Sequence, residues 1–229
     1  MPMQPIDKNK AVTFIGFGPS SHEELETVGE VWSMSRCYDA FTPQLMDATT
    51  RIFGMHPHEK IMNERSAHDH KPHYWHLDQW GKRGKRIIML KKHDLITNSE
   101  TYPLFEMEAA FQVRLWASTP HYMWAMAIHE GYGEIRTIGL DSLDWMHTIS
   151  REGDCGWAMY ALARGITISG EIPFHHRHRK RYGYDFAAGW TDERNEMLWE
   201  GFPFEIKWKE GFTRSPVVES DWEKRKLSE

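Results

Sequence analysis

The stretch Val12-Thr-Phe-Ile-Gly-Phe-Gly-Pro-Ser-Ser21 gives the strongest indication of the fold. An apolar run leads into a glycine-rich turn, and two hydroxyl side chains follow where a helix would begin. Gly16 and Gly18 let backbone amides approach a ligand without an intervening Cβ. Ser20 can cap the next helix, whose N-terminus carries a partial positive charge. Such a turn is typical of a phosphate site, although the third glycine of the dinucleotide fingerprint is absent, so a plain strand-to-helix turn is the alternative.

Composition places the chain among globular proteins. It has 229 residues, of which 40% are hydrophobic and 27% charged, with a formal net charge of −5. This length predicts one domain with an extension rather than two domains. No apolar run approaches the about 18 residues of a spanning helix, and the N-terminus has no signal-peptide core, so we expect an intracellular protein without a membrane partner. Cys37 and Cys155 are too few for a disulfide framework.

Six short apolar or β-branched runs are bounded by glycine, proline, asparagine or charge and predict buried strands. They are Val12–Phe17, Glu30–Met34, Arg51–Met55, Arg86–Leu90, Glu134–Leu140 and Ile166–Ile172. Helical patterns fall between several of them. This alternation predicts an α/β, Rossmann-like three-layer fold, with a mainly parallel sheet of about six strands covered on both faces.

Two helices are well marked in the sequence. In the first, over residues 119–130, Thr119 can serve as N-cap with Pro120 at the first helical position, and Gly131 ends the helix. The second runs from about residue 156 to 164. Beyond residue 174 the pattern changes to a basic run followed by aromatic residues. We therefore expect a Rossmann-like domain over 1–173 and a C-terminal extension, 174–229, packed on it.

Polar side chains follow the predicted strands at their carboxyl ends, where ligands bind in open parallel sheets. His56 follows the third strand and can act as a general base or phosphate partner. Ser118 and Thr119 open the helix, and Asp141 ends the fifth strand. Small hydroxyls, a histidine and a carboxylate suit a phosphate and ribose hydroxyls, with Asp141 as the acceptor. The alternative is that strand ends are polar because they are turns.

Two stretches together resemble a family. They are Phe14–Ser20 with Val31–Tyr38, and Ser118–Asp141. The pairing is similar to a group of phage-encoded Rossmann-like proteins of unknown function and, more remotely, to CMP-sugar-dependent bacterial sialyltransferases. In those transferases a Gly-x-Gly-Pro-Ser turn contacts the nucleotide, and a hydroxyl-bearing helix start and a strand-end aspartate complete the site.

The resemblance implies a nucleotide or nucleotide-sugar ligand and a transferase-like activity, in a phage protein of the host cytoplasm or the virion. This chain has Phe17 and Ser35 where the transferases have asparagine. Their catalytic histidine lies in a long lid, whereas here His147 is the only histidine in a short segment after Asp141. The candidate bases are therefore His56 and His147. The alternative is a non-catalytic virion or host-interaction protein that keeps the scaffold without the chemistry.

Six histidines lie between residues 56 and 76. His68-x-His70 and His73-x-x-His76 have spacings that could hold a metal, but no zinc signature is present and we favour a polar surface loop without metal. The basic runs Lys82–Arg86 and Arg177–Arg181 are short in a net acidic chain, so solvated loops are favoured over nucleic-acid binding.

Overall fold

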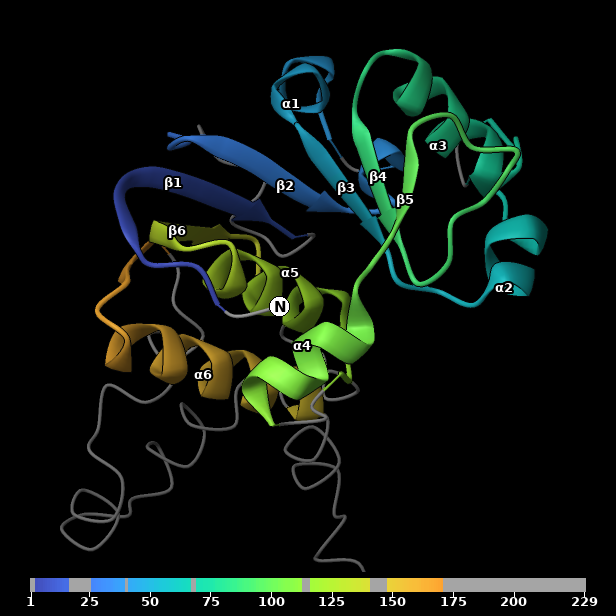
Figure 1. The fold of residues 1–229 in the computed structure, drawn as a ribbon. Coiled ribbons are helices and arrows are strands. Elements are labelled where there is room, and N and C mark those ends of the chain that lie inside the picture. Colours follow the sequence, from blue (N-terminus) through green and yellow to red (C-terminus); the bar gives the residue numbers. More distant parts are fainter. Residues whose placement is uncertain are drawn as a thin grey trace, which may run out of the picture. The chain divides into compact units, whose positions relative to one another are not determined.

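Seven strands form one sheet in which every neighbouring pair is parallel (Figure 1). They are β1 (Asp7–Ile15), β2 (Glu30–Met34), β3 (Arg51–Gly54), β4 (Arg86–Met89), β5 (Ser99–Thr101), β6 (Tyr132–Ile138) and β7 (Thr167–Gly170). Their order across the sheet is β5-β4-β3-β2-β1-β6-β7. The predicted α/β, Rossmann-like fold with a parallel sheet is therefore confirmed, with seven strands instead of about six.

This computed structural model describes residues 3–16, 26–39, 41–66, 69–112, 116–140 and 148–170, with only the backbone given for 148–152. The chain divides into two compact units. One comprises Met1–Ser142 and Ile149–His175, and the other Leu143–Thr148 and His176–Glu229. All described residues except Thr148 belong to the first unit. The expected extension, 174–229, lies outside the described residues and stays a prediction.

Side chains alternate along the strands between two apolar layers. Phe53 and Ile88 belong to one buried cluster, whereas their neighbours Ile52 and Ile87 belong to another. Successive residues of a strand point to opposite faces, so both faces of these strands must be covered. The helices α1 (Pro43–Ala48), α2 (His58–Asn63) and α3 (His73–Lys82) supply the second cluster. The first cluster contains residues of α4 (Leu104–Phe111), α5 (Thr119–His129) and α6 (Thr148–Ala163).

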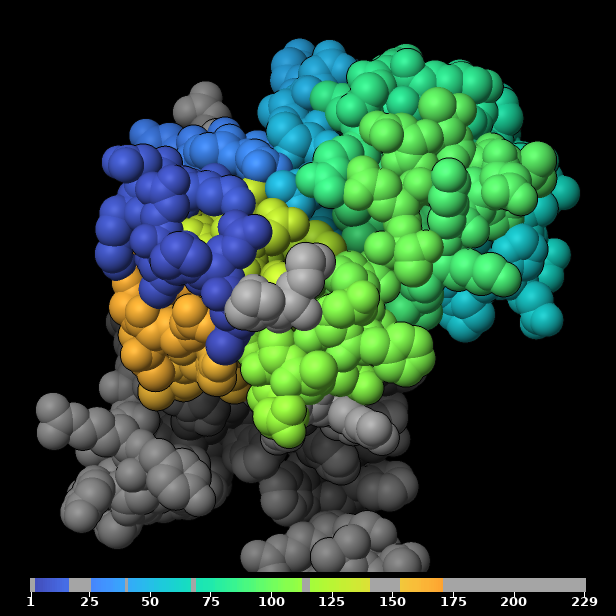
Figure 2. All heavy atoms as spheres, viewed as in Figure 1, coloured from blue at the N-terminus to red at the C-terminus, as the bar shows by residue number. Residues whose placement is uncertain are grey.

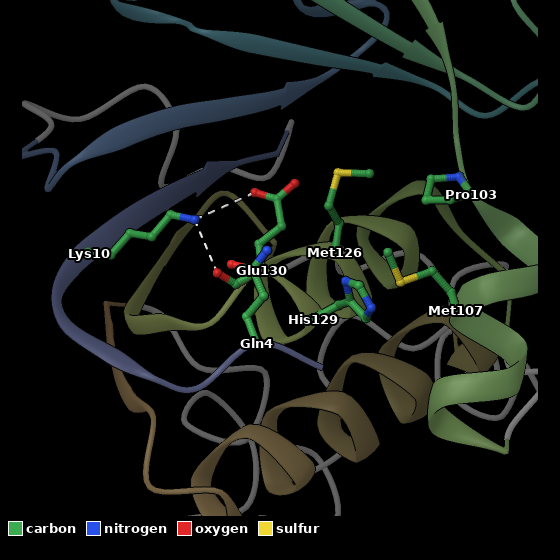
Figure 3. Close-up of a pocket in the computed structure, with 7 residues that line it drawn as sticks. All are labelled: Gln4, Lys10, Pro103, Met107, Met126, His129 and Glu130. Atoms are coloured by element: carbon green, nitrogen blue, oxygen red, sulfur yellow. Dashed lines mark hydrogen bonds and ion pairs between the residues drawn. The ribbon is translucent and has the colours of Figure 1, made fainter. Parts of the chain in front are cut away.

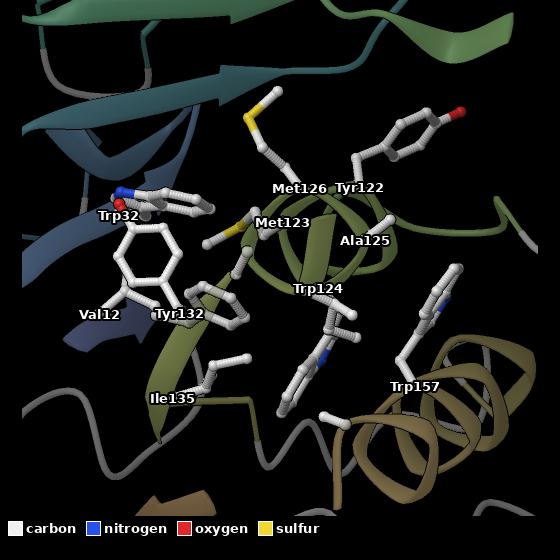
Figure 4. Close-up of a cluster of buried hydrophobic side chains, with 14 of the residues drawn as sticks. Val12, Trp32, Tyr122, Met123, Trp124, Ala125, Met126, Tyr132, Ile135 and Trp157 are labelled. Atoms are coloured by element: carbon white, nitrogen blue, oxygen red, sulfur yellow. The ribbon is translucent and has the colours of Figure 1, made fainter. Parts of the chain in front are cut away.

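Helix α5 is buried on all sides. Every residue from Pro120 to His129 is buried, and Figure 4 shows Met123, Trp124 and Met126 radiating from it in different directions. Such a helix must be covered all round. The sheet covers one side, and on another the α6 backbone at Gly153 lies against the ring of His121. The predicted helix over 119–130 is thus present, but Ser118 occupies the N-cap position and Thr119 is the first helical residue.

A buried guanidinium joins the amino ends of three strands to the C-terminus of α5. Arg51, the first residue of β3, donates to Glu30 of β2 (Nε to Oε2, 2.9 Å) and to Glu130 after α5 (Nη1 to Oε1, 2.8 Å). It lies 4.4 Å from the ring centroid of Trp32 and donates to the hydroxyl of Tyr132 in β6 (3.2 Å). Burial raises the pKa of Glu30, but hydrogen bonds from Tyr132 and Trp32 and the charge of Arg51 outweigh it and bring that pKa to about 2.

The structure differs from the sequence prediction at one strand and two helices. Strand β5 is three polar residues, Ser-Glu-Thr, so no apolar run marks it, and among the described strands it pairs only with β4. Helix α6 begins at Thr148, eight residues before its predicted start. The predicted surface loop around His73 is wrong, because α3 begins at His73 and Gly81 lies within it. Among the described residues, no helix combines the length and apolar character needed to cross a membrane.

Replacing Arg51 with methionine should reduce the free energy of unfolding by about 3 kcal/mol, because two carboxylates lose a buried partner. The side chain of Arg51 is 6% exposed. The matched control is Arg86→Met, since Arg86 and its partner Glu100 are 41% and 39% exposed and such pairs contribute about 1 kcal/mol or less. Urea denaturation of both variants measures this, and equal losses would contradict the central role of Arg51.

Two glycines of α6 should respond in opposite directions to alanine. A Cβ on Gly153 would lie 2.2 Å from Cε1 of the buried His121 ring, whereas a Cβ on Gly156 meets nothing within 4 Å. We expect Gly153→Ala to lower stability by about 2 kcal/mol through overpacking. Gly156→Ala should raise it by roughly 1 kcal/mol through helix propensity. Thermal unfolding of the pair measures the difference, and a stabilised Gly153→Ala protein would refute the α5–α6 contact.

A candidate ligand site at the carboxyl ends of the strands

The strand order reverses direction at β1. From β1 the chain builds outward through β2 to β5 on one side, and then adds β6 and β7 on the other. Ile15 of β1 is paired with Ile138 of β6, so the segments after these two residues leave the sheet together. In open parallel sheets this reversal opens the crevice in which ligands bind. The predicted turn at Gly16 is thus located at the switch point.

Gly16 is fixed by a close approach of two backbones. A Cβ on Gly16 would lie 2.1 Å from the carbonyl oxygen of Gly139, which itself has φ +66°. The amide of Gly16 donates to the carbonyl of Ile138 (2.8 Å). Because this amide is already used within the sheet, it is not free to bind phosphate. An anion cradle here would depend on the residues that follow, and Gly18 and Ser20 lie outside the described residues.

The start of α5 presents a buried hydroxyl with no partner. Ser118 has the extended backbone of an N-cap (φ −148°, ψ 160°) but makes no capping hydrogen bond, and its Oγ is buried and unpartnered in the described part of the chain. The hydroxyl of Tyr102, just after β5, donates to the carbonyl of Tyr122 (3.1 Å). Ser118 and half-buried Thr119 therefore lie at the carboxyl edge beside the end of β5, whereas Gly16 lies at the β1–β6 junction.

The remaining predicted residues are placed as follows. Ser35 follows β2 and is 2% exposed, lying against Gly54 at the end of β3. His56 follows β3 and is half-buried. Burial lowers the pKa of His56, the charge of Lys60 lowers it further, and Glu64 opposes both. Asp141 and His147 lie outside the described residues, so their roles stay predictions.

A tyrosine–histidine pair lies beside His56 and was not foreseen. Tyr38, in the short 3-10 helix Cys37–Asp39 after β2, forms a hydrogen bond through its hydroxyl with Nδ1 of His73 (2.5 Å). His73 opens α3 and is fully buried, and its Nε2 has no partner among the described residues. Burial lowers the pKa of His73 to about 4, and the charges of His56 and Arg36 act in the same direction. The imidazole is therefore neutral at pH 7.

His76, the second histidine of the His73-x-x-His76 spacing, also contacts Tyr38. The ring of His76 stacks on Tyr38 (centroids 4.0 Å apart, 9° between planes), and its Nε2 lies 3.0 Å from Oδ1 of Asp69. Within the described ranges, histidine, cysteine and carboxylate side chains do not gather in threes in a way that could hold a metal ion. His68 falls outside those ranges. Both histidines therefore contact Tyr38, His73 through a hydrogen bond and His76 through ring stacking.

A pocket of about 250 Å³ lies away from the predicted site (Figure 3). Its lining residues are Gln4, Lys10, Pro103, Met107, Met126, His129 and Glu130. Lys10 Nζ donates to the carbonyl of Glu130 (3.1 Å) and lies 3.7 Å from its carboxylate. Gln4 precedes β1 and Glu130 follows the C-terminus of α5, whereas Pro103 and Met107 come after the carboxyl end of β5. None of the predicted ligand or catalytic residues that the structure describes lines the pocket.

The buried His73 should make stability depend on pH. Its pKa is about 4 when folded and about 6.5 when unfolded, so below pH 6.5 the unfolded chain binds the extra proton. The wild type should therefore lose about 3 kcal/mol between pH 7 and pH 4 through this group, and His73→Gln should lose that much less. Urea denaturation at both pH values measures it. Equal losses in the two proteins would show that His73 titrates normally.

No protein-family model and no curated protein matches this chain. Among solved structures, it is similar to the sialyltransferase CstII from Campylobacter jejuni in two complexes. With cytidine-5'-monophosphate the TM-score is 0.46 at 16% identity, covering 72% of this chain and 80% of CstII. With CMP-3FNeuAc it is 0.48 at 17%, covering 72% and 81%. Because the sequence identities are 16% and 17% and both TM-scores are below 0.5, the similarity assigns no activity and no site residue to this chain.

Proposed function

We propose that this protein binds a nucleotide or nucleotide-sugar at the carboxyl edge of its sheet and acts as a glycosyltransferase-like enzyme. The observation that carries the proposal is the reversal of strand order at β1, where β1 and β6 leave the sheet together. The unpartnered hydroxyl of Ser118 at the start of α5 supports it, because a helix N-terminus favours an anion. The sequence resemblance to phage-encoded proteins and CMP-sugar-dependent transferases adds the ligand class.

Each predicted site residue has a role in this proposal. The turn after β1 holds the phosphates, with Gly16 shaping it and Gly18 and Ser20 supplying contacts. Ser118 and Thr119 add hydroxyls from α5, and Ser35 lies at the neighbouring strand end. Asp141 accepts a ribose hydroxyl, and His56 or His147 deprotonates the acceptor. A transferase needs such a base together with donors that stabilise the leaving phosphate.

A thermal-shift series with nucleoside monophosphates and nucleotide-sugars tests the binding step. A ligand at a hundredfold excess over its Kd adds about 2.7 kcal/mol, which corresponds to a rise in Tm of roughly 5–10 °C for a chain of this size. We expect one nucleotide class to produce this shift in the wild type, and Ser118→Ala and Asp141→Ala to reduce it by at least half.

The control for that series is Thr167→Ala, which removes an exposed hydroxyl at the amino end of β7. It should keep the full shift. If no nucleotide raises the Tm of the wild type, or if Thr167→Ala loses the shift as much as Ser118→Ala, the proposed site is wrong.

A second function, a non-catalytic phage protein that binds a virion or host partner, is favoured by one surface. Helix α6 has no charged residue between Cys155 and Ala163, and Met159, Tyr160 and Leu162 are 58%, 37% and 43% exposed (α6 is orange in Figure 2). Exposed apolar helix faces mark interaction surfaces. Absence of any nucleotide shift, together with a partner lost on Met159→Glu, would favour this function.

A further inference from the structure

The turn before α5 is held by a histidine instead of by its own N-cap serine. Ser118 occupies the N-cap position, yet its hydroxyl makes no capping hydrogen bond. His121, three residues later, accepts the backbone amide of Ala117 at Nδ1 (3.1 Å). We propose that His121 is a positioning residue of the nucleotide site, because it fixes this turn and leaves the Ser118 hydroxyl for the phosphate of the ligand. This inference rests on the proposed function and adds a residue to the same site.

The sequence explains why Ser118 does not cap its own helix. An N-cap hydroxyl normally accepts the amide of the second or third helical residue. The second helical residue is Pro120, which has no amide hydrogen. The third is His121, and its amide donates to the carbonyl oxygen of Ser118 (3.2 Å). Neither residue therefore bonds to the hydroxyl, and Ser118 Oγ is buried without a partner in the described part of the chain.

His121 takes the part that an acidic or amide side chain plays in a capping box. In that motif the side chain of the third helical residue reaches back and accepts the amide of the N-cap residue. Here the Nδ1 atom of His121 reaches one residue further, to Ala117. Because a backbone amide can only donate, Nδ1 is the acceptor and carries no proton. The imidazole is therefore neutral in this arrangement, with its proton on Nε2.

Helix α6 holds the other edge of the His121 ring. A Cβ on Gly153 would lie 2.3 Å from Nε2, so glycine leaves room for the ring. The next residue, Asp154, places Oδ1 3.6 Å from Nε2, and the two side chains are 0% and 6% exposed. Burial raises the pKa of the Asp154 carboxyl well above its ordinary value. The contact with Nε2 therefore needs an oxygen lone pair at this position and no negative charge.

These contacts connect α6 to the start of α5. Asp154 and Gly153 fix the ring of His121, and the ring in turn fixes the amide of Ala117, the residue before Ser118. Contacts of this kind behind a binding residue keep it in the geometry that its ligand requires. Loss of the ring nitrogen would release the turn, so that ordering Ser118 would have to take place on binding and would weaken the affinity.

A packing role and a positioning role for His121 make opposite demands on its replacement. Phenylalanine matches the ring in size but has no nitrogen to accept the Ala117 amide. Asparagine is smaller, but its Oδ1 occupies the place of Nδ1 and can accept that amide. If packing alone matters, His121→Phe is the milder change, whereas positioning makes His121→Asn the milder change for binding.

The ligand-independent test is hydrogen exchange at the Ala117 amide in full-length protein labelled with nitrogen-15. This amide should exchange at least about tenfold more slowly in the wild type and His121→Asn than in His121→Phe. Ring nitrogen shifts at pH 7 should show His121 protonated on Nε2 alone. A proton on Nδ1, or equal exchange in the three proteins, would overturn the inference whether or not the protein binds nucleotides.

The binding test is calorimetric titration with CMP, UMP, GMP and AMP. For a nucleotide that the wild type binds, His121→Phe should raise Kd about tenfold or more, because the hydroxyl bond to a charged phosphate is weakened. His121→Asn should stay within about threefold of the wild-type Kd. Its Tm should nevertheless fall at least as far as that of His121→Phe, because the smaller side chain leaves a cavity.

Asp154 supplies a second pair of variants that does not alter α5. Asp154→Asn keeps an oxygen that can face Nε2, so its Kd should stay within about threefold of the wild-type value. Asp154→Leu has a similar size without the acceptor and should raise Kd about fivefold or more. The matched control is His129→Phe, the same substitution of a buried histidine at the other end of α5, which should keep the wild-type Kd.

The outcomes separate the two proposals. If the wild type binds none of the nucleotides or nucleotide-sugars, the proposed function fails and the role of His121 fails with it. If the wild type binds one and His121→Phe keeps at least half of the affinity, the positioning role fails while nucleotide binding stands. Affinities that follow the Tm of the variants, or an equal loss in His129→Phe, would also overturn the inference, since the effect would then be one of packing.

Discussion

The buried guanidinium of Arg51 is the interaction on which this sheet depends. It binds Glu30 at the start of β2 and Glu130 after α5, and it contacts Tyr132 at the start of β6. β2 and β6 flank β1 on opposite sides. A single charge therefore ties together the amino ends of strands on both sides of the switch point. The carboxyl ends of β2 and β3 carry a separate network, in which Asp39 pairs with Arg36 and Tyr38 is hydrogen-bonded to His73.

The two edges of the sheet differ in how their polar groups are paired, and this difference agrees with the proposed function. Charge at the amino edge is satisfied internally, since Arg51 is paired and the Lys10 ammonium contacts Glu130. At the carboxyl edge, by contrast, polar atoms are left without partners in the described residues, including Ser118 Oγ and His73 Nε2. Unpartnered buried polar atoms are costly, and a bound ligand or water is the usual compensation. In the pocket beside Met107 and Met126, none of the described lining side chains has a buried polar atom without a partner.

Much of the fold could be predicted because apolar runs mark most of the strands. Six of the seven strands were located, and β5 was missed since its three polar residues, Ser99–Thr101, carry no apolar signal. The start of α5 was recognisable from Ser118, Thr119 and Pro120. The Tyr38–His73 pair was not, because the two residues are 35 positions apart and meet only when α3 packs beside the turn after β2. The sequence analysis placed His73 and His76 in a polar surface loop instead.

The sequence by itself determined the parallel α/β sheet, through short β-branched runs between helical patterns, and the glycine turn at the end of β1. Tertiary structure alone decided how those parts are used. It committed the Gly16 amide to Ile138, because the two strands pair to their last residues. It also buried His73 against Tyr38. Local patterns follow from neighbouring residues, whereas a hydrogen-bond partner and a shifted pKa depend on which distant elements the sheet brings together.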